Sequence, residues 1–187
     1  DQMGRKVSFN FPPKRIISLV PSQTELLFDL GLENEVVGLT KFCIYPKEKV
    51  QSKTKISGTK KYQFDRIEAL EPDIIIGNKE ENEKTQIEEL SQKYPVWMSD
   101  IETLENALEM IQKIGEITNK TIEAKLLNQK IFSSFFSLNR QLTTDNRQPK
   151  TAYFIWRKPF MAAANQTFIN EMLKEAGFKN VFENQNR

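Results

Sequence analysis

A long proline-free stretch constrains the fold of this chain most. It runs from about Leu104 to Leu142, and no glycine follows Gly115 within it. Its second half, Thr121–Leu142, has the apolar spacing of three, four or seven positions that is typical of one helix face. At about 1.5 Å per residue, such a helix spans about 30 Å, the width of a small domain. It is either a crossover inside one sheet or a rod that joins two lobes, and we expect the rod. The apolar residues are Ile122, Leu126, Leu127, Ile131, Phe132, Phe135, Phe136, Leu138 and Leu142.

The composition excludes several classes of protein. The length of 187 residues permits one large or two small domains. A hydrophobic share of 39% with 28% charged residues is typical of a packed core rather than of disorder. The net charge of +2, with acids and bases interspersed, argues against nucleic-acid binding. We find no apolar run near the length of about 18 residues that crosses a membrane, and no signal peptide. We therefore expect a cytoplasmic protein, or a mature or trimmed form of an exported one.

Two residue types limit the chemistry. Cys43 is the only cysteine, so there is no internal disulfide, and we expect it to be a small buried residue rather than a reactive thiol. The chain has no histidine, which removes Ser-His and Cys-His catalysis and the commonest zinc ligand. Phosphate-binding and nucleophile motifs are also absent, and no cluster has metal-ligand spacing. We therefore predict neither catalytic residues nor a bound metal.

Before the long helix, the pattern predicts alternating strands and helices. Continuous apolar runs indicate parallel strands that are covered on both faces. Ser22 and Glu25 have the spacing of a capping box. Either Asp100 or Thr103 is expected to cap the helix that leads to the rod. The expected strands are Lys6–Phe11, Arg15–Val20, Glu35–Thr40, Asp73–Gly77 and Val96–Met98. The expected helices are Ser22–Leu30, Pro46–Val50, Phe64–Leu70 and Lys84–Lys93.

After the rod, the pattern begins a second α/β unit. We expect a strand over Thr151–Trp156, a helix that starts at Asn165 or Thr167 and ends at Gly177, and another strand from Val181. A unit of about 40 residues or fewer rarely folds alone. Either this unit depends on the rod, or the natural protein is longer than the chain. The predicted division is an N-terminal lobe over 1–118, a backbone helix over 119–144 and a C-terminal lobe over 145–187.

Loops at the carboxyl ends of parallel strands meet at one edge of a sheet, where ligands bind. Phe42 and Tyr45 follow one expected strand, and Trp156 and Phe160 lie at the end of another. Cationic side chains fall in the same kind of loop. A cleft with these side chains would suit an anionic ligand with flat or apolar portions. The cationic residues are Lys41, Lys60, Lys61, Lys79, Arg157 and Lys158.

Two stretches resemble a known family. Pro13–Glu25 (PKRIISLVPSQTE) and Phe64–Ile76 (FDRIEALEPDIII) are similar to signatures of the periplasmic substrate-binding proteins of ABC importers for cobalamin and ferric siderophores. This resemblance implies an α/β fold with two Rossmann-like lobes that contain parallel sheets. One long backbone helix joins the lobes, and the ligand is held between them. Family members usually continue for several tens of residues, so the second lobe is expected to be incomplete here.

The resemblance also implies roles for single residues. Phe42 falls where cobalamin-binding members have a stacking tyrosine, and Tyr45 belongs to a matching Tyr-Pro pair. Asp65 falls on the acid that docks a lobe on arginines of the permease. Thr59 and Asn78 fall where cobalamin binders carry tryptophans, which favours an anionic siderophore, haem or another chelate. The expected ligand-binding residues are Pro21, Ser22, Phe42, Tyr45, Thr59, Lys60, Asn78, Lys79, Trp156, Arg157 and Phe160.

The functional expectation is a binding protein and not an enzyme. It has no intrinsic cofactor, captures a cobalamin or a ferric chelate, and delivers this small-molecule ligand to an ABC transporter permease. We expect a monomer without nucleic-acid partners in the periplasm or on the outer face of the cell envelope, with or without a lipid anchor. One alternative is an α/β enzyme without a metal that acts on a small anionic substrate. Another is a protein that uses this fold for protein interaction.

Overall fold

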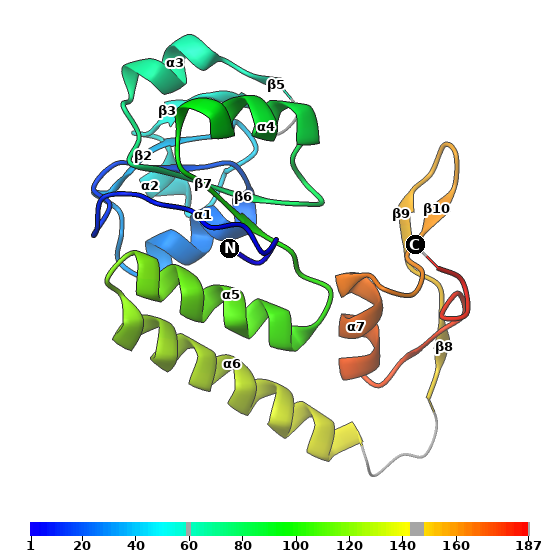
Figure 1. The fold of residues 1–187 in the computed structure, drawn as a ribbon. Helices are drawn as coiled ribbons and strands as arrows, with labels where there is room; N and C mark the ends of the chain where they lie inside the picture. Colours follow the sequence, from blue (N-terminus) through cyan, green and yellow to red (C-terminus); the bar gives the residue numbers. More distant parts are fainter. Residues whose placement is uncertain (59–60, 143–147, 187) are drawn as a thin grey trace. The chain divides into compact units, whose positions relative to one another are not determined.

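The chain forms two compact units. The computed structural model describes residues 1–58, 61–142 and 148–186. Unit 1 comprises Asp1–Asp100 and Lys113–Glu123, and unit 2 comprises Ile101–Gln112 and Ala124–Arg187. Helices α5 (Leu104–Ile117) and α6 (Thr121–Leu142) therefore each contribute residues to both units (Figure 1). The predicted boundaries at 118 and 144 remain a prediction.

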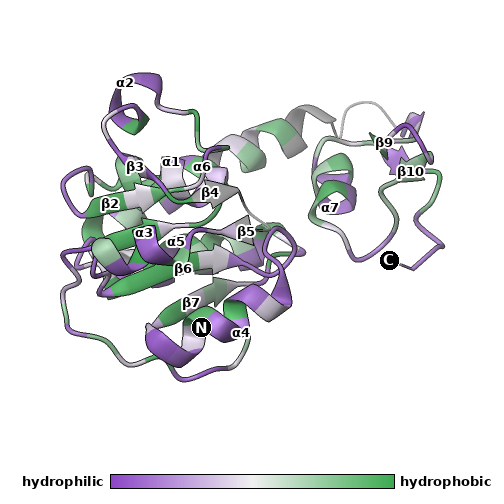
Figure 2. Cartoon of the chain, turned by 90° about the horizontal axis from the view of Figure 1, so that it is seen from above, coloured by the Kyte–Doolittle hydropathy of each residue, from purple (hydrophilic) through white to green (hydrophobic). Residues whose placement is uncertain are grey.

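Unit 1 contains a five-stranded sheet in the order β3-β2-β1-β6-β7, in which every neighbouring pair is parallel. The parallel strands predicted from the continuous apolar runs are confirmed. Ile17 of β1 and Ile75 of β6 pair in register and are both 0% exposed, since the strands are covered on both faces. Hydrophobic colour concentrates on these strands in Figure 2. The strands are β1 (Ile16–Ser18), β2 (Val36–Leu39), β3 (Thr54–Lys55), β6 (Ile74–Asn78) and β7 (Val96–Ser99).

The helices of unit 1 lie near their predicted positions, but the capping box is wrong. Val20 is the N-cap of α1, and no side chain caps this helix. Pro21 has the backbone angle of a first helical residue, so the helix begins there and Ser22 already lies inside the first turn. The helices are α1 (Pro21–Asp29), α2 (Lys47–Val50), α3 (Phe64–Ala69) and α4 (Lys84–Lys93). A hairpin of β4 (Ser57–Gly58) and β5 (Lys61–Tyr62) lies between β3 and α3.

The strand predicted over Lys6–Phe11 is wrong. Arg5, Val7 and Phe9 are partly buried in alternation with exposed residues, but this segment joins no sheet. Residues 1–5, here named the N-terminal strap, lie beside edge strand β7 instead. Its polar groups occupy the outward backbone groups of β7 and of the residue that follows it. The bonds are Gln2 N to Met98 O, Met98 N to Asp1 Oδ2, Arg5 Nη2 to Val96 O, and Asp100 N to Gln2 Oε1.

Helix α6 spans the predicted residues without a break. The hydroxyl of Thr103 accepts a hydrogen bond from Asn106 N, so Thr103 rather than Asp100 caps α5. Asn119 has a φ of 61° between α5 and α6. The chain enters α5 after β7 of the five-stranded sheet and leaves α6 toward β8 (Lys150–Thr151), which pairs with β11 (Lys179–Asn180) in a different sheet. The two helices therefore do not form a crossover within one sheet. This agrees with the prediction of a rod.

The spacing predicted one apolar face for α6, but the apolar residues of this helix do not share one face. Ala124 is fully buried, while Leu127 and Ile131 are partly buried. Leu126 and Phe132, in contrast, are 54% and 59% exposed. Steps of three or four positions connect neighbours on one face, but the full set of apolar residues extends around the helix, so the prediction of a single apolar face is wrong. The exposed members with described side chains are Ile122, Leu126, Phe132, Phe136 and Leu138.

Unit 2 ends in short elements that differ partly from the prediction. The predicted strand over Thr151–Trp156 is divided into β8 and β9, because β8 pairs with β11 whereas β9 turns back onto β10. The strand predicted from Val181 is wrong, since the pairing ends at Asn180 and turns follow. Thr167, not Asn165, caps α7 by accepting from Asn170 N. The elements are β8 (Lys150–Thr151), β9 (Phe154–Trp156), β10 (Met161–Ala162), α7 (Phe168–Glu175) and β11 (Lys179–Asn180).

Candidate functional site

The sheet of unit 1 reverses its strand order between β1 and β6. From β1 the chain moves through β2 to β3 on one side, and β6 then returns to the other side of β1. In open α/β sheets, ligands bind outside the carboxyl ends of the strands at such a reversal. Because all pairs are parallel, the loops after β1, β2 and β6 lie at one edge, as the sequence predicted.

The expected ligand-binding residues after β1 and β6 differ in their exposure and in their hydrogen-bond and ion-pair partners. Pro21 is partly exposed and Ser22 is exposed, and the Ser22 side chain caps no helix. Asn78 is engaged at both ends: its amide donates to Ser99 Oγ, and its carbonyl oxygen accepts from two backbone N–H groups. Lys79 forms an ion pair with Asp100, with 2.5 Å between Nζ and Oδ2. Asn78 and Lys79 therefore have structural contacts in addition to any role toward a ligand.

A buried polar network holds this edge together, and sequence reasoning missed it. Gln23 of α1 donates to Gly77 O at 3.0 Å and to Ser99 Oγ at 2.7 Å. A Cβ on Gly77 would lie 2.6 Å from Asn82 Oδ1 and 2.8 Å from Met98 Sδ, so no larger residue fits there without a shift. The only sequence signal was the glycine near a strand end, which indicates a close approach of other groups.

Tyr62 closes the same network from the β4–β5 hairpin. Asn82 donates from Nδ2 to Tyr62 Oη and accepts at Oδ1 from Asn78 N. Burial raises the pKa of Tyr62 above its ordinary value, and the hydrogen bond from Asn82 partly opposes this shift. The hydroxyl therefore stays protonated under conditions in which an exposed tyrosine ionises.

The pH dependence of stability should report the raised pKa of Tyr62. Above pH ~10 the unfolded chain loses this proton whereas the folded chain keeps it, so the unfolded state binds fewer protons and stability falls as pH rises. Tyr62→Phe removes this loss, but lowers stability by about 1–3 kcal/mol near neutral pH because Asn82 loses its partner. Urea unfolding at several pH values from neutral to alkaline measures both effects. Equal alkaline slopes in the two proteins would contradict this assignment.

The loop after β2 carries the two exposed aromatic residues expected there. Phe42 is 50% and Tyr45 is 60% exposed. Cys43 between them is 1% exposed, as predicted for a small buried residue. Its sulfur accepts from Thr24 Oγ1 at 3.1 Å and lies 3.3 Å from Thr40 Oγ1, which ties the loop to α1.

Beside this loop, a cavity of about 420 Å³ lies entirely within unit 1. Its lining includes Lys55, which donates from Nζ to Cys43 O at 3.2 Å and to Val50 O at 3.1 Å. Burial lowers the pKa of Lys55, while the nearby Cys43 raises it. No sequence pattern indicated Lys55 or the cavity, because they depend on how α2 and the loop fold over β3. The lining also includes Lys41, Ile44, Tyr45, Lys47, Val50 and Gln51.

Two of the expected ligand-binding residues, Thr59 and Lys60, lie outside the described residues.

A second cavity, of about 520 Å³, lies by Arg5–Ser8 and Ser91–Val96, at the opposite end of β7 from the strand-end loops. The strand-end residues listed above therefore do not line it.

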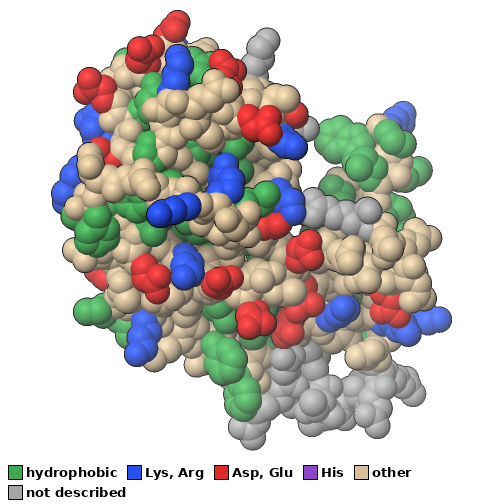
Figure 3. Space-filling model, viewed as in Figure 1, with side chains coloured by type: hydrophobic (Ala, Val, Ile, Leu, Met, Phe, Trp, Pro, Cys, Tyr) green, Lys and Arg blue, Asp and Glu red, His purple; other side chains and the backbone are tan. Residues whose placement is uncertain are grey.

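The expected residues of unit 2 lie on the β9–β10 hairpin. Trp156 ends β9 and is 64% exposed, Arg157 is exposed in the turn, and Phe160 is 74% exposed. Phe154 packs edge-on against Phe160, with 5.8 Å between ring centroids. Figure 3 shows hydrophobic side chains gathered on this part of unit 2. The hairpin thus presents an aromatic surface with a cation beside it.

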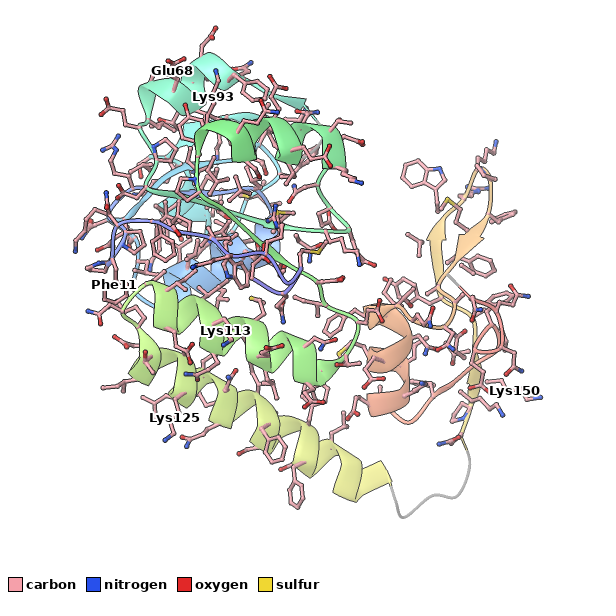
Figure 4. All side chains as sticks on the ribbon, in the orientation of Figure 1. Phe11, Glu68, Lys93, Lys113, Lys125 and Lys150 are labelled. Atoms are coloured by element: carbon pink, nitrogen blue, oxygen red, sulfur yellow. The ribbon has the colours of Figure 1, made fainter. Side chains whose placement is uncertain are left out.

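Asp65, the expected permease-docking residue, lies exposed in the first turn of α3. Glu68, one helical turn further along, is also exposed and points outward from α3 in Figure 4. The carboxylates at positions 65 and 68 lie on the same helix face by their spacing. The position of Asp65 suits a contact with another protein.

Within the described residues, no three His, Cys, Asp or Glu side chains come together in a way that could hold a metal ion. None of the described helices has the length and apolar character needed to cross a membrane. On the face of unit 1 seen in Figure 3, acidic and basic side chains are interspersed.

Residues 16–187 match the family described as periplasmic binding protein. The chain belongs to this family. The resemblance drawn from the two signature stretches is thereby confirmed.

Curated relatives carry names from the same class. The chain is 27% identical over 176 residues to the vitamin B12-binding protein of Vibrio campbellii, covering 92% of the chain and 62% of that relative. It is 26% identical over 193 residues to an uncharacterized ABC transporter substrate-binding lipoprotein of Bacillus subtilis, covering 99% of the chain and 60% of that relative. The chain thus spans less than two thirds of the length of these relatives.

Solved structures share the fold. The periplasmic vitamin B12 binding protein of Vibrio cholerae matches with a TM-score of 0.83 at 22% identity, over 95% of this chain and 69% of that one. Staphylococcus aureus IsdE, solved with heme, matches with a TM-score of 0.80 at 19% identity, over 93% of this chain and 65% of that one. The predicted fold class, α/β with parallel strands and a long backbone helix, is confirmed.

Proposed function

We propose that this periplasmic binding protein is the ligand-capturing component of an ABC importer and that its ligand is a metal chelate of the cobalamin, siderophore or haem type. The observation that carries the proposal is the family match over residues 16–187. Relatives and structural neighbours named for vitamin B12 and heme binding support it. The chelated metal would be cargo and not an intrinsic cofactor.

The exposed aromatic residues support the proposed ligand class. Phe42 and Tyr45 in unit 1, and Trp156 and Phe160 in unit 2, are each at least half exposed. Exposed aromatic groups at a strand end are costly to leave in water and suit the flat, largely apolar body of a macrocycle. Arg157, in the turn beside Trp156, supplies a cation for an acidic side group.

Direct titration tests the proposal. Purified protein is titrated with cyanocobalamin, haemin and a panel of ferric siderophores, with quenching of tryptophan fluorescence as the signal. Trp97 is buried and Trp156 is exposed, so the signal should come mainly from Trp156. Native mass spectrometry of the same mixtures gives the stoichiometry, expected to be one ligand per monomer. Absence of binding by every compound would overturn the ligand class.

We further propose that the protein is not an enzyme. Burial raises the pKa of Tyr62, but its hydroxyl accepts a hydrogen bond from Asn82 inside the polar network, and we assign it a structural role. The alternative, an enzyme without a metal that acts on a small anionic substrate, would need a carboxylate with a strongly raised pKa at the site. Hydrogen bonds from its own backbone N–H and from Lys120 instead lower the pKa of the Glu123 carboxyl group.

The proposed partner is the membrane-embedded permease of an ABC importer, and the proposed location is outside the cytoplasm, in the periplasm or on the outer face of the envelope. The lipoprotein relative supports this location and a lipid anchor. We propose that Asp65 on α3 contacts arginines of the permease, because its carboxylate is exposed.

Asp65→Ala should separate capture from delivery. Ligand affinity should stay within about twofold, whereas transport by the permease reconstituted in liposomes should fall about tenfold, equivalent to a lost interaction of about 1.4 kcal/mol. Glu88→Ala, which removes an exposed carboxylate from α4, is the matched control and should leave transport unchanged. A collapse of ligand affinity in Asp65→Ala would show that this residue contacts the ligand instead.

A further inference from the structure

The cavity formed by α2, β3 and the loop after β2 has only positive charges in its lining. Its lining contains Lys41, Lys47 and Lys55, and none of the described lining residues is acidic. Lys41 lies over the Phe42 ring, with Nζ 5.2 Å from the centroid. Three ammonium groups without a carboxylate repel one another and favour the entry of an anion.

Lys55 is the innermost of these cations. It is partly buried, whereas Lys41 and Lys47 are exposed. Its ammonium donates to the backbone carbonyl groups of Cys43 and Val50, which leaves one of its three N–H donors without a described partner. A half-buried cation without a counter-ion is costly.

A neighbouring lysine outside the cavity differs in this respect, because Lys49 pairs with the Glu33 carboxylate at 3.3 Å. Lys53, also outside the cavity, donates to the Glu33 backbone carbonyl at 2.5 Å, as Lys55 does to its carbonyl partners. Neither of them lines the cavity. A carboxylate is thus available to a lysine of the neighbouring surface, whereas none of the residues that line the cavity carries one.

Apart from the lysines and Gln51, the lining is mainly apolar. Val50 is 4% exposed, and the side chains of Ile44 and Tyr45 are exposed. A volume of about 420 Å³ falls within the range of small-molecule sites, about 300–1,000 Å³. An inorganic anion would leave most of this apolar surface uncovered.

We propose that this cavity binds an organic carboxylate, with the Lys55 ammonium on the carboxylate and with Val50, Ile44 and Tyr45 against its apolar body. The natural occupant would be an acidic side group of the imported chelate, and in that respect the inference rests on the proposed function. Cys43 contributes its backbone carbonyl, which holds Lys55, and not its thiol.

The test uses naphthalene-2-carboxylate and its neutral isostere naphthalene-2-carboxamide as probes. Calorimetric titration of the full chain should show at least tenfold tighter binding of the carboxylate. Equal affinities would overturn the proposal without the need for any variant. Inorganic phosphate should compete only weakly, and competition as strong as that of the carboxylate would show that the apolar walls play no part.

Variants then assign the cation. Lys55→Met should weaken carboxylate binding at least tenfold and leave carboxamide binding unchanged. Lys55→Gln, which keeps an N–H donor for the two carbonyl groups, should give the same selective loss if Lys55→Met folds poorly. Lys53→Met, outside the cavity, is the matched control and should bind like the wild type. Retention of the carboxylate preference in both Lys55 variants would overturn the assignment.

The subsite and the proposed function can fail separately. A protein that prefers the carboxylate but binds no chelate supports the subsite and contradicts the proposed ligand class. A protein that binds a chelate but does not distinguish the carboxylate from the carboxamide overturns the subsite and leaves the ligand class supported.

Discussion

Replacing Ile75 with alanine is expected to lower the free energy of unfolding by about 2–5 kcal/mol. Ile75 is 0% exposed in β6 and pairs with Ile17 of β1 on one side and Val96 of β7 on the other. The truncated side chain leaves a cavity that a sheet covered on both faces cannot close. Urea denaturation followed by circular dichroism measures the loss.

Ile122→Ala is the matched control for this experiment. Ile122 belongs to the same unit and is 74% exposed on α6. The same atoms are removed, but little buried surface is lost, so a change within about 0.5 kcal/mol is expected. A similar loss in both variants would mean that Ile122 is buried in solution and would contradict its exposed position on α6.

Trp156→Ala is expected to have the largest effect on ligand binding. Affinity for the tightest chelate in the panel should fall about tenfold or more, because exposed tryptophans that anchor a ligand each contribute at least about 1.4 kcal/mol. Trp156 is 64% exposed, and its indole N–H donates to Lys158 O, which orients the ring. Radiolabelled or absorbance-based equilibrium dialysis measures the affinity without tryptophan fluorescence.

Tyr153→Ala and Trp156→Phe complete the design. Tyr153 is an exposed aromatic residue just before β9 and is not among the expected ligand-binding residues. Its removal should leave the affinity within about twofold, and Trp156→Phe should retain most of the binding. Equal losses for Tyr153→Ala and Trp156→Ala would indicate a general effect on the hairpin and contradict a specific contact.

The parts of the fold that were predictable depend on local patterns. Buried parallel strands such as Ile74–Asn78 are continuous apolar runs, and helix Thr121–Leu142 has an uninterrupted period with no breaker. The failures depend on partners that are distant in sequence. Lys6–Phe11 alternates as a strand does, but it joins no sheet, and residues 1–5 rather than this segment bond to the outward backbone groups of β7.

The candidate site shows the same limit. That Phe42 and Tyr45 follow a parallel strand could be predicted, because strand direction alone brings such loops to one edge. Lys55 could not be singled out among 27 lysines and arginines, since its environment is created by backbone carbonyl groups of α2 and the preceding loop. The roles of the expected ligand-binding residues remain predictions, and the titrations above test them.

The N-terminal strap has a consequence for the behaviour of the protein in solution. An open margin of a parallel sheet is a template on which a strand from another molecule can assemble. Here four outward hydrogen-bonding positions at that margin are already occupied by Asp1, Gln2 and Arg5. Proteolytic removal of this short segment is expected to expose the backbone groups of Val96–Ser99 and to promote association between molecules, so that resistance of the protein to aggregation depends on five residues.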